Sequence, residues 1–562
     1  MSVAKHHLLL SLLVASCGSS KATPPSDAGH VSLDAGMVQL GHVDVLMQHN
    51  DMARTGQNLH ETVLTQANVT AQSFGKLKTL PVDGLLYAQP LIVTDTMING
   101  AAHDVLLVAT LHNSVYAFDA NTYEQLYMHN LGPSVPASEI GPINPATGKP
   151  QGGINIQVEV GIVATPVIDR GNGLVYLTRK SWNATTSTQS TVMHVLSLAT
   201  GQDMPGSPVT IAASLPGPDG YGASPVVFDT QWQLQRTSLL LMGNTAYFAF
   251  ASHEDFEPYH GWIMGYTYDV SAQTLTQTQL FCDTPDGTEG GIWNSGQGLL
   301  SDGTDIYALT SNGTVNQPMG GKSYGEAFLR LNTSLVVQDW FTPVEWSMLN
   351  AEDIDLGSGG PVLIPGTSPP LLVGGGKEGK LYVVDSTSMG HLGVTDDMNT
   401  QEWPLVPPPD ARSIYGSPVL WTGSPTQTLF IWAVGDFVRK FAMTGATFNE
   451  TPVALGTVSN LQVGGQDPVG NLAITSSGST AGTGILWGMR PNANPDHTTV
   501  AGTFYAFSAD DLHTLWSSAM NSARDGMGSY AKFVPPTVAN GKVYLATHSN
   551  QLLVYGLLGD AQ

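Results

Sequence analysis

The strongest constraint on the fold of this chain is a strand-and-turn unit that recurs along almost its whole length. Each unit begins with a short apolar strand, continues with a second strand that ends near Tyr, and returns with a third that ends in an acidic or Ser/Thr turn. Six units begin around a proline, at residues 88–91, 164–167, 223–226, 359–362, 416–419 and 534–537, and two begin without one, at 293–298 and 470–473. Eight such units predict an all-β fold, a single eight-bladed β-propeller.

The two ends of the repeat region indicate how the ring closes. The last unit has strands at 541–547 and 551–555, and no fourth strand follows before residue 562. Upstream of the first unit, residues 74–81 have the pattern of a strand that belongs to no unit. We expect this N-terminal strand to complete the last blade, because the pairing removes two open sheet edges. The propeller is expected over residues 44–562.

Composition excludes some classes of partner. The chain of 562 residues carries a formal net charge of −24 and only 21 Lys and Arg residues. Nucleic acid is therefore not expected as a partner, because phosphate binding needs a basic face. Cys17 and Cys282 are the two cysteines, so the sequence predicts neither a disulfide framework nor a cysteine metal site. Cys282 follows Leu280 and Phe281, which indicates a buried thiol.

The first residues have the pattern of an export signal. Lys5, His6 and His7 precede an apolar run at 8–15 that is too short to span a bilayer. The run ends Leu13-Val14-Ala15-Ser16-Cys17, which resembles the bacterial lipobox. This resemblance implies a signal peptide at 1–16, lipidation of Cys17, a flexible tether at 17–43 and attachment to the outer membrane through the lipid alone. The alternative is an ordinary secretion signal in which the cysteine has no role.

The first unit also resembles a known repeat. Residues 117–127 read Ala117-x-Asp119-x-x-Thr122-Tyr123-x-x-x-Tyr127. This is similar to the repeat of quinoprotein (pyrroloquinoline-quinone, PQQ) alcohol dehydrogenase-like propellers, in which Gly and Trp stand where this chain has Tyr123 and Tyr127. In that superfamily the Trp of each blade docks into the next blade. The chain is identified as a divergent member, because most units lack this Trp.

A second resemblance covers residues 44–558. The stretches 48–56, 252–262, 376–380 and 532–542 look like those of a group of secreted propellers from soil bacteria. This resemblance supports the fold and implies no activity.

The residues just before the innermost strands are the main site candidates, because in a propeller they gather at one end of the axis. They mix charged, polar and aromatic side chains, as polar binding sites do. The set is Gln89, Glu159, Thr165, Ser224, Trp293, Ser295, Gln297, Asp355, Ser358, Arg412, Tyr415 and Lys532. We expect its four charged residues to surround one mouth of the channel. The alternative is that these side chains only satisfy backbone groups and waters.

Two further clusters carry potential metal ligands. His253, Tyr259, His260 and Trp262 lie close to Glu254 and Asp255, a set that could bind a metal. The sequence favours a connecting loop packed by aromatic side chains. Asp283, Asp286 and Glu289 surround Gly287, but their spacing does not match an EF-hand, so an Asp-Gly turn is favoured over a calcium site.

Two functions remain open. The favoured one is a non-catalytic, lipid-anchored module that binds an envelope protein or polysaccharide and needs no cofactor; the eight-bladed lipoprotein of the outer-membrane barrel-assembly machine is a precedent on this fold. The alternative, implied by the quinoprotein resemblance, is a PQQ- and calcium-dependent alcohol or sugar dehydrogenase. In such an enzyme, the best candidates are Trp293 to stack on the quinone, Glu159 and Asn294 to bind calcium, and Asp355 to act as the base. The adjacent cysteine pair of many such enzymes is absent.

Overall fold

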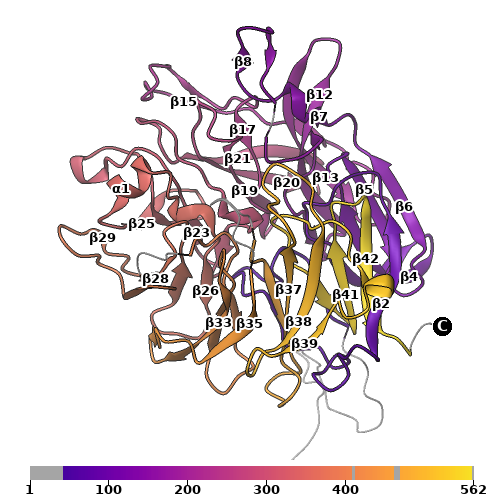
Figure 1. Ribbon diagram of the computed structural model, residues 1–562. Helices are drawn as coiled ribbons and strands as arrows, with labels where there is room; N and C mark the ends of the chain where they lie inside the picture. Colours follow the sequence, from indigo (N-terminus) through magenta and orange to yellow (C-terminus); the bar gives the residue numbers. More distant parts are fainter. Residues whose placement is uncertain (1–41, 153, 408–411, 461–468, 560–562) are drawn as a thin grey trace, which may run out of the picture. The chain divides into compact units, whose positions relative to one another are not determined.

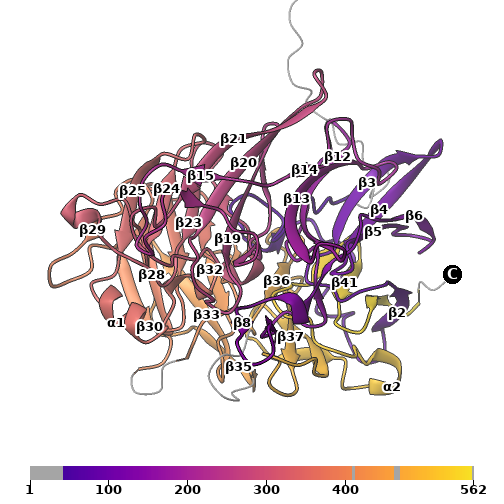
Figure 2. The same cartoon turned by 90° about the horizontal axis from the view of Figure 1, so that it is seen from above.

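The computed structural model describes residues 42–152, 154–407, 412–460 and 469–559. In this part of the chain, eight antiparallel sheets follow one another in chain order around an axis, which confirms the predicted eight-bladed β-propeller (Figure 1). The view turned by 90° shows strands of successive blades side by side (Figure 2). Among the described residues, helices are too short to cross a bilayer.

Each blade has four main strands, ordered from the axis to the rim. The strands of the first four blades are β3 (Leu91–Ile98), β4 (Ala101–Ala109), β5 (Ser114–Asp119) and β6 (Gln125–Asn130); β11 (Val167–Asp169), β12 (Leu174–Asn183), β13 (Thr188–Ser197) and β14 (Val209–Thr210); β18 (Leu240–Met242), β19 (Thr245–Ser252), β20 (Trp262–Asp269) and β21 (Thr274–Cys282); and β22 (Leu300–Ser301), β23 (Ile306–Leu309), β24 (Phe328–Leu331) and β25 (Val337–Thr342).

The other four blades repeat this plan. Their strands are β26 (Val362–Ile364), β27 (Leu371–Gly374), β28 (Lys380–Asp385) and β30 (Gln401–Pro404); β31 (Val419–Trp421), β32 (Thr428–Ile431), β33 (Phe437–Thr444) and β35 (Ala454–Ser459); β36 (Leu472–Thr475), β37 (Ile485–Pro491), β38 (Gly502–Ser508) and β39 (Thr514–Ser517); and β40 (Thr537–Ala539), β41 (Lys542–Ala546), β42 (Gln551–Leu557) and β2 (Phe74–Pro81).

Short elements connect or extend the blades. The strands are β1 (Gln57–Asn58), β7 (Val135–Pro136), β8 (Ile143–Asn144), β9 (Lys149–Pro150), β10 (Glu159–Val160), β15 (Ser214–Leu215), β16 (Val226–Val227), β17 (Gln233–Leu234), β29 (His391–Leu392) and β34 (Thr447–Phe448). The helices are α1 (Trp346–Ala351), α2 (Ser522–Asp525) and the 3-10 turns η1 (Ala137–Glu139), η2 (Asn294–Gly296), η3 (Gln317–Met319) and η4 (Leu356–Ser358).

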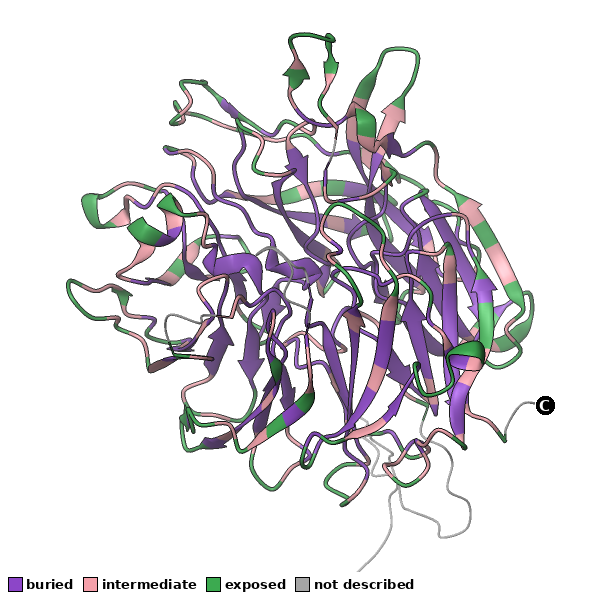
Figure 3. Cartoon of the chain, in the orientation of Figure 1, coloured by how far each residue is buried: buried purple, intermediate pink, exposed green. Residues whose placement is uncertain are grey.

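The middle strands of each blade are buried on both faces, because neighbouring blades pack face to face. All six residues of β5 are buried, whereas β6 at the rim alternates exposed and half-buried residues. Figure 3 shows the same pattern, with buried residues along the strands and exposed ones in the outer turns. Burial on both faces explains why the inner strands read as short apolar runs without alternation. Cys282, at the end of β21, is a buried free thiol as expected.

The predicted ring closure is confirmed. Strand β2 pairs antiparallel with β42, from Phe74 opposite Leu557 to Pro81 opposite Gln551. Phe74 is fully buried and lies 5.1 Å, centroid to centroid, from the ring of Trp516 in the preceding blade. The N-terminal strand therefore adds apolar contacts as well as backbone hydrogen bonds to the last blade.

The predicted start of the third unit is wrong. Residues 223–226 precede the blade, and Ser224 is exposed rather than axial. Val226 belongs to β16, which pairs with β15. The inner strand of the third blade is β18, and Ser238 precedes it. The Pro-Val pair misled the prediction because it marks a turn before a strand and does not specify which strand follows.

Residues 42–61, here called the N-terminal belt, run along the inner strands of the whole ring. Backbone or side-chain hydrogen bonds join the belt to every blade. In order from blade eight around to blade eight again they are Val43–Asn540, Val45–Ile92, Leu46–Ile168, Arg54–Leu239, Met52–Ser301, Ala53–Leu363, Thr55–Leu420, Gly56–Ile474 and Asn58–Val538. The belt thus connects eight separate sheets at the axis.

Arg54 is the central side chain of this belt. It is fully buried and donates hydrogen bonds to the carbonyl oxygens of Leu299 (3.0 Å), Gln48 (2.6 Å) and Leu239 (3.0 Å). Burial lowers the pKa of its guanidinium to about 10, and the nearby Asp51 opposes this change. His49 is also buried, and burial together with Arg54 lowers the pKa of its imidazole to about 4.

Aromatic side chains still dock one blade onto the next at positions where this sequence departs from the quinoprotein repeat. Tyr127, which stands at the repeat's Trp position, donates a hydrogen bond of 2.8 Å to the carbonyl oxygen of Leu198 in the next blade. A Cβ at Gly201 would lie 2.5 Å from the Tyr127 ring, so only glycine fits there. Trp403 packs in the same way on Phe441 of the following blade.

Candidate functional site

The small polar residues before the inner strands link neighbouring blades. Gln89 donates its backbone N–H to Thr165 Oγ1 (2.8 Å) and its side-chain amide to Thr537 Oγ1 (3.0 Å). Thr165 in turn donates its N–H to Ser238 Oγ (3.3 Å). Gln297 donates to the carbonyl oxygen of Pro361 in the next blade. These contacts satisfy polar groups of the protein, which is the alternative stated for the residues before the inner strands. A ligand role for Gln89, Thr165 and Gln297 therefore stays a prediction.

A charged cavity of about 70 Å³ lies beyond these residues at one end of the axis. Its lining residues precede the inner strands or come from loops at the same end, whereas the N-terminal belt contacts residues within the strands. The lining consists of Asn155, Arg236, Glu254, Asp255, Trp293, Asp355, Ser358, Lys377, Tyr415, Asp496 and Phe533. Four carboxylates and two cations therefore meet at the axial cavity.

Asp355 and Lys377 form the main ion pair of the axial cavity. Lys377 Nζ lies 2.7 Å from Asp355 Oδ2 and 2.8 Å from Asp353 Oδ1. The other oxygen of Asp355 accepts a 3.3 Å hydrogen bond from the N–H of Asn312. Burial lowers the pKa of the Lys377 ammonium, but the nearby anionic groups, Asp355 first among them, outweigh burial and raise it above its usual value.

Arg236 forms a second cationic centre between two aromatic rings. Its guanidinium carbon lies 4.9 Å from the ring centre of Trp293 and 4.1 Å from that of Phe533. Such cation–π contacts stabilise a buried cation. Burial lowers the pKa of Arg236 to about 10, and the negative charge of Asp355 opposes this change most strongly. One face of the Trp293 ring is thus engaged by a side chain of the protein itself.

Asp255 is the accessible carboxylate of the cavity. Its side chain is exposed to the channel mouth, and Tyr259 donates a 2.9 Å hydrogen bond to Oδ1. Desolvation of the carboxyl group by the protein around it, followed by the charges of Asp355 and Asp353, raises the pKa of Asp255 to about 7. This carboxylate is poised to change charge near neutral pH.

The structure brings part of the predicted site together. Asp355, Ser358, Trp293 and Tyr415 line the axial cavity. Lys532 is buried beside it and donates hydrogen bonds to the carbonyl oxygens of Asn155 and Asp496, and burial lowers its pKa to about 7. Asn294 and Ser295 are buried in η2, next to the cavity residue Trp293.

Three of the four charged residues expected at one mouth do not line the axial cavity: Lys532 lies buried beside it, and Glu159 and Arg412 make contacts elsewhere. Glu159 lies in β10, within the long insertion between the first two blades, and pairs with His112 (3.1 Å) and Ser134. Arg412 packs its main chain against Gly379. Both precede an inner strand by several residues, so the loop can carry them away from the axis.

Sequence reasoning missed Arg236, Lys377 and Asp496 as cavity residues, and read Asp255 only as part of a metal cluster. Lys377 and Asp255 lie in two of the stretches that prompted the second resemblance, 376–380 and 252–262. Asp496 lies in the loop between β37 and β38, far in sequence from any inner strand. A search restricted to inner-strand positions could not include these loop residues.

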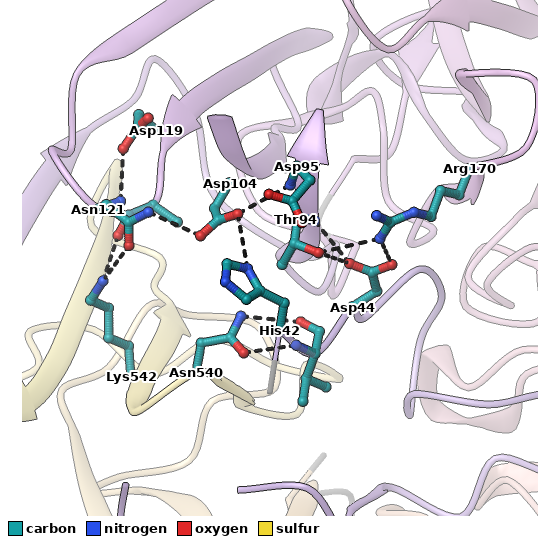
Figure 4. Close-up of polar contacts among 12 residues, drawn as sticks. His42, Asp44, Thr94, Asp95, Asp104, Asp119, Asn121, Arg170, Asn540 and Lys542 are labelled. Atoms are coloured by element: carbon teal, nitrogen blue, oxygen red, sulfur yellow. Dashed lines mark hydrogen bonds and ion pairs between the residues drawn. The ribbon is translucent and has the colours of Figure 1, made fainter. Parts of the chain in front are cut away.

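The other predicted clusters engage protein groups. His260 contacts Thr284 and Asp219, while His253 is buried apart from them near Lys180. Asp283 accepts a hydrogen bond from Gly261 N–H, and Asp286 accepts from Ser323. Among the described residues, the ligand atoms close enough to share a metal belong to His42, Asp95 and Asp104. Figure 4 shows the three side chains, of which Asp95 and Asp104 belong to β3 and β4 of the first blade and His42 to the N-terminal belt.

The axial residues do not fit the quinone alternative. PQQ is a tricyclic quinone, and ligand pockets for molecules of this kind usually measure about 300–1,000 Å³, against about 70 Å³ for the cavity. The ring of Trp293 is covered by Arg236. Glu159, one of the two expected calcium ligands, is paired with His112 and does not line the cavity.

Comparisons with known proteins bear on the fold. No protein-family model matches the sequence, and no curated protein matches it. Among solved structures, a quinohemoprotein alcohol dehydrogenase from Pseudomonas putida HK5 is similar, with a TM-score of 0.55 and 12% identity over 92% of this chain and 81% of that one. A europium-containing methanol dehydrogenase gives the same TM-score and identity over 92% of this chain and 98% of that one.

This chain has the propeller fold of the quinoprotein alcohol dehydrogenases. The resemblance expected from the first unit is therefore confirmed at the level of fold. Identity of 12% does not extend to activity, because one fold carries many functions and function depends on the site.

Proposed function

We propose that this protein is a non-catalytic binding module of the cell envelope whose axial cavity receives a cationic group, such as a primary ammonium, from a protein or polysaccharide. The observation that carries this proposal is the excess of carboxylates in the cavity: Glu254, Asp255, Asp355 and Asp496 against Arg236 and Lys377. An ammonium supplies the missing charge, and the ring of Tyr415 in the lining favours a cation.

Asp255 is the residue expected to contact the ammonium. It is exposed at the mouth, and one oxygen is held by Tyr259 while the other has no hydrogen bond within the described part of the chain. Nearby Asp355 and Asp353 disfavour its negative charge. A bound ammonium removes part of this repulsion, so ligand binding and deprotonation of Asp255 support each other.

The geometry argues for binding rather than oxidation of an alcohol. Asp355, the base in the dehydrogenase alternative, has one oxygen paired with Lys377 and the other with Asn312 N–H. Both oxygens of Asp355 are therefore already engaged by groups of the protein. The similarity to the two dehydrogenases concerns the propeller fold.

Attachment of the protein to the outer membrane is the second part of the proposal. It is supported by the lipobox-like run that ends at Cys17. Cys17 and most of the expected tether lie outside the described residues. Lipidation would hold the propeller at a membrane surface, where an envelope protein or polysaccharide is the available partner.

Calorimetric titration of the purified protein tests the axial cavity. The probes are acetyl-Gly-Gly-Lys-Gly-Gly-amide and a glucosamine hexamer, each titrated at pH 7 with its N-acetylated form as control. Binding of the peptide alone indicates a protein source, and binding of the hexamer alone a polysaccharide source. Failure of both ammonium probes, or equal binding of the acetylated forms, contradicts the proposal.

The variant Asp255→Asn tests whether Asp255 contacts the ammonium. It should weaken binding of the peptide at least tenfold at pH 8, and it should abolish the tightening expected between pH 6 and pH 8, because that tightening follows deprotonation of Asp255 (pKa about 7). Asp396→Asn removes an exposed carboxylate elsewhere and is the matched control. An unchanged affinity in Asp255→Asn would place the ligand outside this cavity.

A further inference from the structure

A second, larger depression lies on the insertion between the first two blades. It measures about 570 Å³, within the range of small-molecule sites. Its walls are η1, the β8–β9 hairpin, the end of the long β12–β13 hairpin and the turn at 229–231. It shares no lining residue with the axial cavity. Figure 1 shows β8 and β12 projecting at the top of the molecule.

Trp182 gives this groove an aromatic wall. The indole is half-buried and packs against the cluster of apolar residues beneath the insertion. Its backbone N–H donates a 3.1 Å hydrogen bond to the carbonyl oxygen of Pro133, which ties β12 to the insertion. The ring is therefore held in place from below while part of it remains accessible.

Polar side chains of both donor and acceptor type complete the groove. The lining includes hydroxyl groups, side-chain amides, two carboxylates and one ammonium, namely those of Ser187, Thr188, Thr230, Gln189, Gln231, Glu139, Asp229 and Lys149. Asp229 and Gln231 come from one turn, in which Asp229 Oδ1 accepts the N–H of Gln231 (2.9 Å). The charges nearly balance, so the groove favours neither a polyanion nor a polycation.

The floor of the groove is fixed by a buried lysine. Lys180 Nζ donates to the carbonyl oxygen of Thr230 (2.6 Å) and to Gln189 Oε1 (3.4 Å), and thereby joins β12, β13 and the 229–231 turn. Gln189 donates its amide to the carbonyl oxygen of Glu139 (2.9 Å). Three of the four walls are thus linked by hydrogen bonds, which pre-arranges the site.

We propose that this groove binds a neutral oligosaccharide segment. A pyranose ring has one face of C–H groups, which packs on the negative face of an indole, and a rim of hydroxyl groups that both donate and accept hydrogen bonds. The groove offers one accessible indole and mixed donors and acceptors around it. Most of the lining side chains are polar, so a hydrophobic peptide is a poorer match.

Isothermal titration with cello-, manno-, xylo- and N-acetylglucosamine hexaoses tests this proposal on the full chain. At least one hexaose should bind with a Kd below about 1 mM. Trp182→Ala should weaken that binding at least tenfold. Trp340→Ala, which removes another half-buried indole stacked on His391, is the matched control and should leave the affinity unchanged.

The double variant Asp229→Ala/Gln231→Ala is a second test that does not depend on the folding of Trp182→Ala, because both of its substitutions lie in a surface turn. It too should weaken binding at least tenfold. The proposal is overturned if none of the four hexaoses binds, or if both groove variants keep wild-type affinity. Because Asp255→Asn does not alter the groove, failure of the ammonium site leaves this test unaffected.

Discussion

At the scale of single residues, the cations near the axis have two different roles, one in holding the fold and one in lining or supporting the axial cavity. Arg54 is buried within the N-terminal belt and gives its hydrogen bonds to backbone carbonyls, which makes it a structural cation. Arg236, Lys377 and Lys532 are placed around the axial cavity instead. The chain contains only 21 Lys and Arg residues, and these four cations are concentrated along the axis of the propeller.

We predict that Arg54→Ala destabilises the protein strongly. The substitution leaves three buried carbonyl groups without a donor, and loss of one partner from such a network costs on the order of 3–5 kcal/mol. Urea unfolding monitored by circular dichroism measures the change. Arg170→Ala removes an exposed partner of Asp44 and should cost less than about 1 kcal/mol. Equal effects of the two variants would contradict a central role for Arg54.

Lys532 should make stability depend on pH. Its pKa is about 7 in the folded protein because of burial, and about 10.4 in the unfolded chain. Between these values the unfolded state binds more protons, so this lysine makes stability rise with pH from about 7 to about 10. Lys532→Met should reduce that rise by on the order of 2 kcal/mol, measured by urea unfolding at pH 7 and pH 9.5.

The exposed Lys78 provides the comparison for Lys532. Lys78→Met should leave the slope of stability against pH as in the wild type. If Lys532→Met also leaves it unchanged, the lysine is charged throughout, held by the carbonyl oxygens of Asn155 and Asp496.

At the scale of elements, the sequence specified blades better than it specified loops. The strand β2 and its pairing with the last blade were predictable, because an extra strand and a missing strand are both visible in the repeat. Ser224 was misplaced because the same Pro-Val signal occurs before β16 and before true inner strands. Asp255, Lys377 and Asp496 lie on loops whose course depends on tertiary packing, so no periodicity marks them.

Truncations from the N-terminus separate the contribution of the N-terminal belt to stability from that of β2. A chain beginning at residue 41 should unfold like the full chain. A chain beginning at residue 62 keeps β2 but loses the belt, and should fold with a lower thermal midpoint. A chain beginning at residue 83 loses β2 as well, leaves β42 unpaired and should aggregate. Light scattering and thermal midpoints distinguish the three, and equal midpoints would show that neither element closes the ring.

At the scale of the whole molecule, the polar sites lie on features added to a regular ring. The axial cavity depends on loops at one end, and the groove depends on an insertion between two blades and on two ten-residue strands. The repeats predicted the ring but not these additions, since an insertion interrupts the repeat that reveals the fold. The similarity to dehydrogenases at 12% identity likewise concerns the ring.

Membrane attachment is also a property of the whole chain. Cys17→Ser should move the protein from the membrane to the soluble fraction and abolish labelling by a fatty-acid probe, because the cysteine is the proposed site of acylation. Fractionation of the producing cells measures this, with Cys282→Ser as the control that retains the anchor. Unchanged membrane partition of Cys17→Ser would contradict the lipid anchor.

The N-terminal belt has a consequence for biosynthesis. Ribosomes release residues 42–81 first, yet the hydrogen bonds of Val43 and Asn58 to the last blade and the pairing of β2 with β42 need residues 538–557. Contacts this distant in sequence form late and slowly. The ring therefore cannot close until the trailing end is made, so we expect a chain that matures after translation is complete and stays competent for passage through a membrane until then.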